Sequence, residues 1–430
     1  MIPADSQGTT QAVILAAGEG QRMLPLSKAH LKGMLSVANK PIIEYIIIEA
    51  QKAGIHDFIL VTNPKDNAIP HYFGDGTKFG IRISYRHQEK VDGTGAALRT
   101  VQDIVRQNFL LFNSDMLISA ADILQLLHAE SITVGVKEKN NTGGFGIIEA
   151  QDSRIRRVVE KPAVASSLLV NTGAYLLNKH IFAAIENTPL SPRGEIELTQ
   201  ALQILIDQGT AVYCTHLESW YDISYPWDLL SANAHLLSQL DSDNQGVIEK
   251  NVHIDGVCRI GSGSIVRSGS YIAGPVIIGD NCDIGPNCYI RSASSIGNNC
   301  RVGNGVEIKN SIIMQGSKIP HMNYVGDSII GENCNLGAGT NIANIRFDKK
   351  DIAVNGFDTN LKKFGAILGD EVQTGINVSI NAGTIIGNRV RVWPGVVAHG
   401  NIPDDTQMKK TNTISATILE KAIDITVCVD

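Results

Sequence analysis

An aliphatic residue returns at every sixth position from Ile248 onward, and this period excludes most ways of folding the second half of the chain. The ladder consists of Ile248, Ile254, Ile260, Val266, Ile272, Ile278, Ile284, Ile290, Ile296, Val302, Ile308 and Met314. It resumes at Ile330, Leu336 and Ile342, and again at Leu368, Thr374, Ile380, Ile386, Val392 and Ala398. A helix repeats about every 3.6 residues and a strand about every two, whereas each flat side of a β-helix takes about six and turns one apolar residue inward. The pattern therefore predicts a parallel β-helix over residues 248–404.

The hexapeptide pattern resembles the left-handed parallel β-helix, whose handedness departs from the usual crossover rule. Two segments interrupt the period. The register slips between Ile319 and Val325, and a charged, non-periodic loop runs from Asn344 to Phe364. Interruptions in a sequence that otherwise follows one rule are where function is expected.

Four of the seven cysteines lie in repeated settings of this ladder, which read GDNC, GPNC, GNNC and GENC. They are Cys282, Cys288, Cys300 and Cys334. The sequence has no Cys-x-x-Cys pair and no histidine cluster with the spacing of a zinc site. We therefore expect reduced thiols that fill the interior of the β-helix.

Length and charge narrow the class of protein. A chain of 430 residues is long enough for two or three domains. The net charge of -6 argues against nucleic acid or an anionic membrane as a partner. No apolar run is long enough to cross a bilayer, and the start MIPADSQGTT lacks the features of a secretory signal. We expect a cytoplasmic protein that binds neither nucleic acid nor membrane.

Residues 1–240 alternate between strand-like and helical patterns, which indicates an α/β domain. The apolar runs at 12–18, 58–63, 81–88 and 108–115 are typical of strands, and those at 40–54 and 95–105 of helices. We predict a mainly parallel, Rossmann-like sheet covered by helices, with ligands at the carboxyl ends of its strands. A polar linker, 241–247, leads to the β-helix, and residues 405–430 form a tail of unknown role.

The segment from Leu15 to Lys32 reads LAAGEGQRMLPLSKAHLK and follows the first predicted strand. Gly18 and Gly20 allow backbone N–H groups to approach oxygen atoms that a side chain would keep away. Arg22 and Lys32 add positive charge where a triphosphate would lie. The segment therefore predicts a phosphate-binding loop. A glycine turn followed by a solvated arginine and lysine is the alternative.

Two aspartates each follow an apolar strand: Asp115 in LLFNSDMLIS and Asp222 in SWYDISYPWDLL. This position places a side chain at the edge of the sheet where ligands bind. Carboxylate oxygens are ligands that Mg²⁺ prefers, so the pair is a candidate metal site. An aspartate after a strand also commonly forms a turn or caps a helix.

The spacing LAAGxGxRMxPLSxxxxK and the aspartate segments resemble the sugar-1-phosphate nucleotidyltransferases. The resemblance implies that a sugar phosphate attacks the α-phosphorus of UTP or dTTP, with Mg²⁺ held by Asp115 and Asp222. Arg22 would hold the triphosphate and Lys32 would touch phosphate during transfer. The implied nucleotide contacts are Leu15, Ala17, Gly18, Gly20, Gln88, Gly93 and Thr94. The implied sugar and sugar-phosphate contacts are Gly146, Glu160, Lys161 and Asn171.

The chain departs from this family beside the charged groups. Leu31 and Gly33 flank Lys32 where the family usually has proline. Ser114 and Ser224 stand where glycine is usual. These changes affect backbone shape and leave the charged groups in place, so we expect them to alter turnover rate rather than reaction type.

From Ile290 onward the β-helix resembles a narrower family, the bifunctional glucosamine-1-phosphate acetyltransferase and N-acetylglucosamine-1-phosphate uridyltransferase. The segments IRS, GNGVEIK, GSKIPHMNYVGD and NLGAGTNIANIRFDKK keep that family's mutual spacing. Acetyl transfer to an amine needs a base that works near neutral pH, and histidine is suited to it. By resemblance His321 is the base, and Glu307 orients or polarises it. The other implied contacts are Arg291 and Lys309 to the sugar phosphate, Tyr324 and Asn335 to the sugar, and Asn344 and Lys350 to acetyl-CoA.

This β-helix resembles those of trimeric proteins that bind the acyl donor between subunits. We therefore expect a homotrimer. The departures from the family are concentrated late in the chain. Ile376 stands where the bacterial form has serine, and Pro394 replaces a small residue. The tail after Asp405 has no resemblance, so we do not expect contacts with acetyl-CoA from these positions.

Three functions remain open from the sequence. The leading hypothesis is N-acetylation of glucosamine- or galactosamine-1-phosphate followed by uridylyl transfer. The second is a nucleotidyltransferase alone, such as a glucose-1-phosphate thymidylyltransferase, with the β-helix as a scaffold. The third is a non-catalytic regulatory subunit, which the altered Leu31-Lys32-Gly33 segment keeps open. Gln88 suits uracil and thymine alike, so the sequence does not separate UTP from dTTP.

Overall fold

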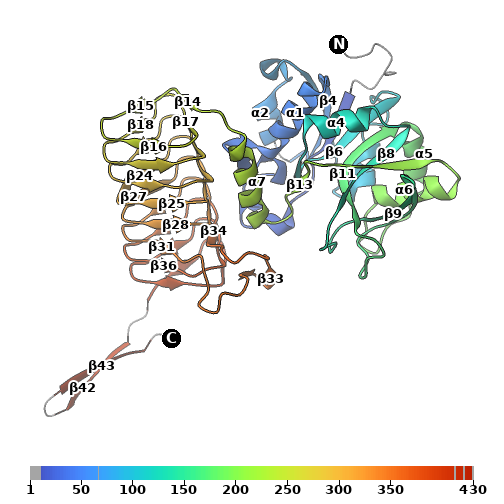
Figure 1. The fold of residues 1–430 in the computed structure, drawn as a ribbon. Helices are drawn as coiled ribbons and strands as arrows, with labels where there is room; N and C mark the ends of the chain where they lie inside the picture. The colour runs from blue at the N-terminus through green and yellow to red at the C-terminus, as the bar shows by residue number, and fades with distance from the viewer. Residues whose placement is uncertain (1–10, 66, 411–412, 420–421, 429–430) are drawn as a thin grey trace. The chain divides into compact units, whose positions relative to one another are not determined.

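The computed structural model describes residues 11–65, 67–410, 413–419 and 422–428. The chain forms two compact units (Figure 1). The first contains residues 11–21, His30–Leu35 and Lys40–Ser224. The second contains Arg22–Ala29, Ser36–Asn39 and the chain from Tyr225 onward. Two short N-terminal segments therefore belong to the same unit as the β-helix.

A nine-stranded mixed sheet forms the centre of the first unit, in the order β5-β4-β1-β6-β11-β8-β12-β10-β9. Its strands are β1 (Gln11–Leu15), β4 (Asp57–Thr62), β5 (Arg82–His87), β6 (Asn108–Asn113), β8 (Ile132–Glu138), β9 (Ile147–Gln151), β10 (Arg154–Val159), β11 (Leu169–Asn178) and β12 (Val212–His216). A separate two-stranded sheet pairs β7 (Met116–Leu117) with β13 (Tyr221–Asp222). The four strands predicted from apolar runs are all present, and β5, β4, β1 and β6 run parallel to one another.

The other half of the sheet departs from the predicted parallel arrangement at three strands, while β8 and β12 pair in parallel. Strands β9, β10 and β11 run antiparallel to their neighbours. Asp152 and Ser153, at φ 50° and 61°, form the turn between β9 and β10, as in a tight hairpin. Parallel neighbours need a crossover of about a dozen residues or more, and residues 147–178, all described, contain no helix between these strands.

Helices cover both faces of the sheet, each over its own hydrophobic core. Ala12 and Ile14 of β1 face a core shared with α1, α2 and α4, whereas Val13 and Leu15 face a core shared with α3, α5 and α6. The helices are α1 (Ile42–Lys52), α2 (Ala68–Phe73), α3 (Thr94–Arg99), α4 (Ala120–Leu127), α5 (His180–Glu186) and α6 (Leu198–Asp207). Burial on both faces explains why residues 12–15 of β1 are all apolar.

The predicted helix over residues 95–105 is shorter in the structure. Helix α3 ends at Arg99, and turns continue the chain to Val105. Thr100 Oγ1 donates to the Ala97 carbonyl at 2.7 Å. Such local bonds from threonine offer the backbone an alternative to the helical pattern, which accounts for the early end.

Three parallel sheets of short strands form the β-helix of the second unit (Figure 1). The first contains β14 (Asp243–Asn244), β17 (Cys258–Ile260), β20 (Val276–Ile278), β23 (Ser294–Ile296), β26 (Ile312–Ile313), β29 (Ile329–Ile330), β34 (Ala366–Leu368), β37 (Thr384–Ile386) and β40 (Asn401–Ile402). The second contains β15 (Val247–Ile248), β18 (Ile265–Val266), β21 (Asp283–Ile284), β24 (Arg301–Asn304), β27 (Lys318–His321), β30 (Asn335–Leu336), β35 (Gln373–Thr374), β38 (Arg391–Val392) and β41 (Gln407–Met408). The third contains β16 (His253–Asp255), β19 (Tyr271–Ala273), β22 (Tyr289–Ile290), β25 (Glu307–Lys309), β28 (Tyr324–Gly326), β31 (Asn341–Ile342), β36 (Ser379–Ile380) and β39 (Val397–Ala398). The predicted β-helix is confirmed.

The predicted ladder forms the interior of the β-helix, but the register changes at other positions than expected. After Ile308 the next inward residue is Ile313, which pairs with Ile296. Met314, which we predicted to be the inward residue of this side, is therefore its neighbour. Ile319 and Val325 keep the period of six, and the next shortened side ends at Ile330. The two shortened sides thus flank the segment that we expected to slip. The four ladder cysteines are buried and free, as predicted.

The second interruption is an insertion between β31 and β34. It contains a small hairpin of β32 (Ala353–Val354) and β33 (Phe357–Asp358), and it ends at the fully buried Phe364. Helix α7 (Pro226–Ser238) belongs to the same unit, and Trp227 lies edge-on to Phe364 at 6.4 Å. Beyond the last coil, β42 (Thr413–Leu419) and β43 (Ala422–Cys428) form an antiparallel pair within the tail. No helix among the described residues is long and apolar enough to cross a membrane.

Candidate active sites

The glycine loop leaves β1 where three parallel strands end side by side. Ala16 N–H donates to the Val61 carbonyl at 2.8 Å, at the end of β4. Ser114 N–H, just after β6, donates to the Leu15 carbonyl at 3.2 Å. These bonds hold the start of the loop between its neighbours at the carboxyl edge of the sheet, which is where ligands bind in open α/β sheets.

The loop itself leaves room above its backbone. Ala17 is buried beneath it, whereas a Cβ atom built on Gly18 would meet no atom within 4 Å. Packing of the protein therefore does not require glycine at position 18, and the open space suits the approach of a ligand. Gly20 has a φ of 64°, in the left-handed region that glycine adopts at little cost.

Lys32 and Asp115 are far apart in sequence and form an ion pair in the first unit. Lys32 begins the short 3₁₀ turn η3 (Lys32–Met34), and Asp115 follows β6. The Nζ atom of Lys32 lies 2.6 Å from Oδ2 of Asp115, and the lysine side chain is only 14% exposed. A shielded ammonium beside a carboxylate is suited to contact a phosphate whose other oxygens bind a cation at that carboxylate.

Two departures from the family face each other beside this pair. A Cβ atom on Gly33 would lie 2.7 Å from Cδ1 and Cγ1 of Ile43 and 3.0 Å from Cβ of Ser114. Ile43 is fully buried, and close-packed interiors resist displacement. Glycine at position 33 therefore leaves the room that Ile43 and the serine at position 114 occupy, while Lys32 and Asp115 remain paired.

Asp222 reaches the same region through the pairing of β13 with β7. It lies opposite Met116, the residue after Asp115, and Ile223 N–H donates to the Asp115 carbonyl at 3.0 Å. Ser224 Oγ donates to Oδ1 of Asp222 at 3.1 Å. The serine that departs from the family thus adds a hydrogen bond to one of the predicted metal ligands.

The two carboxylates interact electrostatically. Burial raises the pKa of Asp222, and the charge of Asp115 raises this pKa further, while Lys139 and Lys32 act in the opposite direction. A divalent cation would relieve the repulsion between the carboxylates. Among the described residues no group of three or more His, Cys, Asp or Glu side chains is arranged to hold a metal ion, so a cation here would rely on these two carboxylates. This donor set therefore fits a cation such as Mg²⁺, which commonly takes one or two carboxylates and completes its shell with phosphate and water.

Three of the predicted sugar contacts, Gly146, Glu160 and Asn171, lie together. A Cβ atom on Gly146 would lie 3.4 Å from Oε2 of Glu160 and 3.5 Å from Cβ of Asn171. Asn171 N–H donates to the Gly146 carbonyl at 2.8 Å, and its side-chain amide donates to the hydroxyl of Tyr175 at 2.7 Å. Burial raises the pKa of Tyr175, and the charges of Glu160 and Asp115 raise this pKa further, so this hydroxyl is under the influence of both groups.

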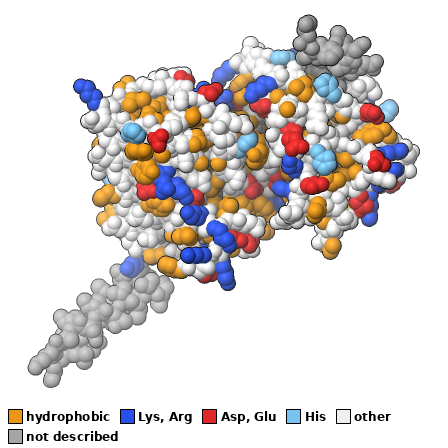
Figure 2. Space-filling model, viewed as in Figure 1, with side chains coloured by type: hydrophobic (Ala, Val, Ile, Leu, Met, Phe, Trp, Pro, Cys, Tyr) orange, Lys and Arg blue, Asp and Glu red, His pale blue; other side chains and the backbone are white. Residues whose placement is uncertain are grey.

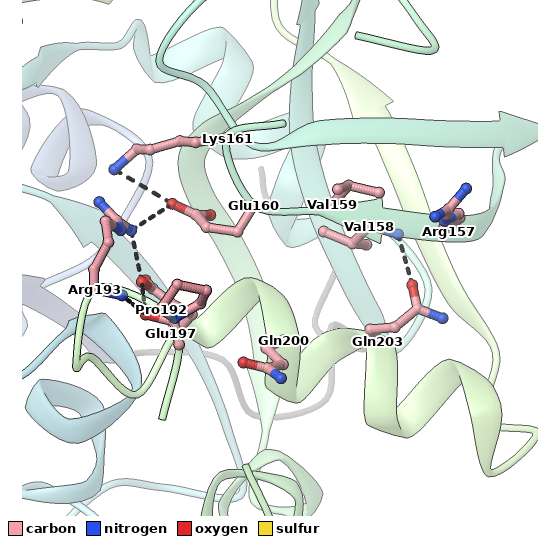
Figure 3. A pocket seen from close by; sticks show the side chains of 11 residues that line it. Arg157, Val158, Val159, Glu160, Lys161, Pro192, Arg193, Glu197, Gln200 and Gln203 are labelled. Atoms are coloured by element: carbon pink, nitrogen blue, oxygen red, sulfur yellow. Dashed lines mark hydrogen bonds and ion pairs between the residues drawn. The ribbon is translucent and has the colours of Figure 1, made fainter. Parts of the chain in front are cut away.

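Glu160 is fixed by a network that the sequence did not reveal. Thr199 Oγ1 donates to its Oε2 at 2.8 Å, and Arg193 contacts its Oε1 at 3.0 Å. Lys161 lies 3.3 Å from the same oxygen, and both cations approach Glu160 in Figure 3. Glu160, Lys161 and Arg193 border a hollow of about 550 Å³ between β10 and α6. Arg193 lies in a loop and Thr199 in α6, both far from Glu160 in sequence, so no local motif predicted them.

The predicted base contacts also lie together. Gln88 is buried, and its amide nitrogen donates to the Gly93 carbonyl at 3.1 Å and to Asp92 at 3.3 Å. Its amide oxygen is thus the atom available to accept the imide N–H of a pyrimidine. Gly93 has a φ of 111°, and a Cβ atom there would lie 2.4 Å from the Ile196 carbonyl oxygen. Thr94 begins α3, and its hydroxyl accepts the Leu198 N–H at 3.2 Å.

Arg22 is the predicted phosphate contact that is not grouped with the others. It belongs to the second unit, where its guanidinium carbon lies 5.5 Å from the centre of the Tyr225 ring. Lys32 and Asp115 belong to the first unit. This position over the ring holds the guanidinium by cation–π attraction.

In the β-helix, a buried aspartate that we did not predict joins three of the predicted residues. Asp327 accepts bonds from Lys309 at 3.0 Å and from the Asn344 amide at 2.5 Å. The same Asn344 amide lies 3.1 Å from the Tyr324 hydroxyl. Asn310 donates a further bond to Asp327 at 2.7 Å. Asp327 has a φ of 50°, a left-handed conformation that aspartate commonly adopts in turns. A turn aspartate is common in a β-helix, so the sequence alone did not single it out as the centre of this network.

The remaining predicted residues of the β-helix are more exposed. His321 ends β27 with an exposed side chain, and Asn335 lies one coil further, next to Lys318. Glu307 is bonded to Arg291 at 2.8 Å; within the described chain it does not bond His321. Lys350 is exposed in the insertion. Figure 2 shows Lys and Arg side chains gathered toward the lower end of the second unit, where Figure 1 draws this insertion.

Both parts of the chain match known sequence families. Residues 11–239 match the family described as "Nucleotidyl transferase", and residues 272–403 match one described as "GMPPB C-terminal domain". The first match covers more than half of the chain, so the first unit defines the protein as a nucleotidyltransferase.

Relatives define the family more narrowly. The "Bifunctional protein GlmU" of Methanocaldococcus jannaschii is 39% identical over 94% of this chain and 98% of its own length. The "Bifunctional sugar-1-phosphate nucleotidylyltransferase/acetyltransferase" of Sulfurisphaera tokodaii is 36% identical over 91% of this chain and 98% of its own length. The chain belongs to this family of bifunctional nucleotidylyltransferase/acetyltransferases, and the recognition made from its motifs is confirmed.

Proposed function

We propose that the protein catalyses two steps of UDP-N-acetylhexosamine synthesis in the cytoplasm. The β-helix transfers an acetyl group from acetyl-CoA to the amine of glucosamine-1-phosphate or galactosamine-1-phosphate. The first unit then transfers a uridylyl group from UTP to the N-acetylated sugar phosphate and releases pyrophosphate. The family assignment supports both types of reaction. The substrates, Mg²⁺, and a homotrimer formed through the β-helix are part of the proposal.

The observation that carries the first reaction is the meeting of Lys32, Asp115 and Asp222 at the strand ends. Asp115 and Asp222 would hold Mg²⁺, which screens the charge between the α-phosphate and the attacking phosphate. Lys32, 2.6 Å from Asp115, would contact the phosphate oxygens near that pair. The sugar would lie against Gly146, Glu160 and Asn171, which would fix the direction from which its phosphate attacks.

For the second reaction we assign His321 as the base that removes a proton from the sugar ammonium. The free amine then attacks the thioester carbonyl, the new C–N bond forms, and the C–S bond breaks to release CoA. The network in which Asp327 holds Lys309 and Asn344, with the Asn344 amide beside Tyr324, supports a sugar-phosphate site in the same unit. The exposed basic insertion has the charge to attract the phosphates of CoA.

Asp115→Asn and Asp222→Asn test the metal site. Each should reduce Mg²⁺-dependent pyrophosphate release by at least about a hundredfold, because an amide does not supply the charge that balances the cation. Asp103→Asn is a matched control, since Asp103 is 69% exposed and paired with Arg86 at 3.1 Å. Turnover and acetyl transfer are measured on the same preparations. Wild-type turnover in either site variant would refute the assignment.

A further inference from the structure

Lys139 is a cation of the first unit that no motif identified. It follows β8 directly, and its backbone N–H donates to the Leu168 carbonyl at 3.0 Å, next to the start of β11. Its ammonium lies 4.5 Å from the centre of the Phe145 ring and 5.1 Å from that of the Trp220 ring. Two aromatic faces therefore hold the ammonium by cation–π attraction.

This lysine has no carboxylate partner. Among the residues that the structure describes, no Asp or Glu oxygen lies within 4.0 Å of its ammonium. Lys32 and Lys161, by contrast, are paired with Asp115 and Glu160. Aromatic rings accept none of the ammonium's N–H groups as strongly as an anion does, so Lys139 retains N–H donors for a further acceptor.

A second observation points to a missing acceptor at the same place. The indole N–H of Trp220 is buried and has no hydrogen-bond partner, although the side chain is only 7% exposed. Buried donors are nearly always paired, and an orphan needs an explanation. Trp220 and Phe145 contact each other edge to face at 6.1 Å, so the orphan N–H and the unpaired ammonium belong to one cluster.

The cluster is connected through the chain to two groups of site residues. Phe145 immediately precedes Gly146 of the sugar contacts, and Trp220 lies two residues before Asp222 of the metal pair. The charge of Lys139 also acts on the Asp222 carboxyl. An anion carried by the sugar substrate would therefore meet an ammonium and an indole N–H that have no other acceptor.

We propose that Lys139, with the Trp220 indole N–H, binds an anionic group of the sugar substrate. Two groups share this chemistry: the 1-phosphate, and a carboxylate on the sugar ring. The inference rests on the proposed function, because it assumes that the acceptor is a sugar phosphate. It assigns Lys139 a binding role and leaves phosphate activation to Lys32 and the metal pair.

Lys139→Met and Lys139→Arg test this role in the full-length protein. Lys139→Met should raise KM for N-acetylglucosamine-1-phosphate about ten- to a hundredfold with a smaller change in kcat, whereas arginine should restore most of the affinity. Trp220→Phe keeps the ring and removes the N–H, and it should raise the same KM by several-fold. The control is Lys78→Met, because the Lys78 ammonium also lies over aromatic rings, 5.9 Å from Tyr72 and 5.6 Å from Phe79, outside the site residues.

Binding measurements separate the two sources of the anion. Wild-type and Lys139→Met proteins are titrated with inorganic phosphate, N-acetylglucosamine-1-phosphate, glucuronic acid-1-phosphate and neutral N-acetylglucosamine. Weaker binding of inorganic phosphate and both sugar phosphates identifies the 1-phosphate as the anion. Weaker binding of glucuronic acid-1-phosphate alone identifies a ring carboxylate. Unchanged binding of all four, with the same loss of melting temperature as Lys78→Met, would overturn the proposal.

The outcome is independent of the proposed reaction. Titration with phosphate reports on Lys139 even if the wild type releases no pyrophosphate. Conversely, if Asp115→Asn abolishes turnover but Lys139→Met leaves KM and binding unchanged, the reaction stands and the role of Lys139 is rejected.

Discussion

At the scale of single residues, Gly33 leaves the room in which Lys32, the proposed phosphate contact, can lie beside Asp115. A Cβ atom at this position would press against the fully buried Ile43 at 2.7 Å. Gly33→Ala should therefore lower the free energy of unfolding by about 1–3 kcal/mol, the usual cost of overpacking a core, and should lower kcat by shifting Lys32. Ile43→Val removes one of the clashing methyl groups and should partly rescue Gly33→Ala. Chemical denaturation and turnover of the single and double variants measure this coupling.

Gly18 provides the contrasting case for this prediction. A Cβ atom there meets nothing within 4 Å, so Gly18→Ala should leave the free energy of unfolding unchanged. If the loop binds phosphate through its backbone, the added methyl group should raise KM for UTP. Strictly additive effects of Gly33→Ala and Ile43→Val, or a loss of stability in Gly18→Ala equal to that of Gly33→Ala, would contradict the distinction between the two glycines.

At the scale of elements, the β-helix interior should protect its thiols. Burial raises the pKa of Cys258, Cys300 and Cys334 to about 12, above the usual value of about 8.5. The folded thiols thus keep their protons where unfolded thiols lose them, so ionisation increasingly favours the unfolded state as pH rises above about 8.5. The melting temperature should fall between about pH 9 and pH 12. The triple Cys→Ala variant should show a weaker dependence over this range.

Alkylation provides a direct measurement of the same property. At pH 8, iodoacetamide should leave these three thiols unmodified in the native protein and should modify them after denaturation, as mass spectrometry of the peptides would show. Rapid native modification of any of the three would mean that the coil containing it opens readily.

The period of six was sufficient to predict the β-helix, because each apolar rung repeats the same local rule. It was not sufficient to place the changes in register. Ile313 and Met314 are both apolar and both buried, so composition does not distinguish the rung from its neighbour; the pairing of Ile313 with Ile296 does. Likewise, apolar runs predicted the strands of the first unit, but strand direction depends on the turns between them, such as Asp152-Ser153.

The candidate sites show the same division. Asp115, Asp222, Lys32 and Glu160 lie in motifs, so the local sequence made them candidates, and their roles stay predictions. Lys139, Thr199, Arg193 and Asp327 were missed because their importance arises from contacts between distant segments. The proximity of Gly33 to Ile43 and Ser114 could not be predicted either, since it arises only in the folded chain.

At the scale of the whole molecule, the proposed reactions use different units, and this separation makes the assignment of His321 testable. His321→Ala should reduce acetyl transfer by at least about a hundredfold, the usual effect of losing a positioned general base. Uridylyl transfer to N-acetylglucosamine-1-phosphate should be unchanged, because Asp115, Asp222 and Lys32 belong to the first unit. Raising the pH should partly rescue acetylation, since the amine then loses its proton without the histidine.

Both reactions, the melting temperature and the mass in solution should be measured on one preparation. The proposed homotrimer should have about three times the chain mass of 46.3 kDa, in the variant as in the wild type. Because the His321 side chain is exposed, its removal should change the melting temperature little. A histidine that only packs its loop would give the opposite pattern, with a lower melting temperature and normal acetylation. If acetylation survives His321→Ala, the base must be another group, and the exposed position of His321 on β27 is then incidental to catalysis.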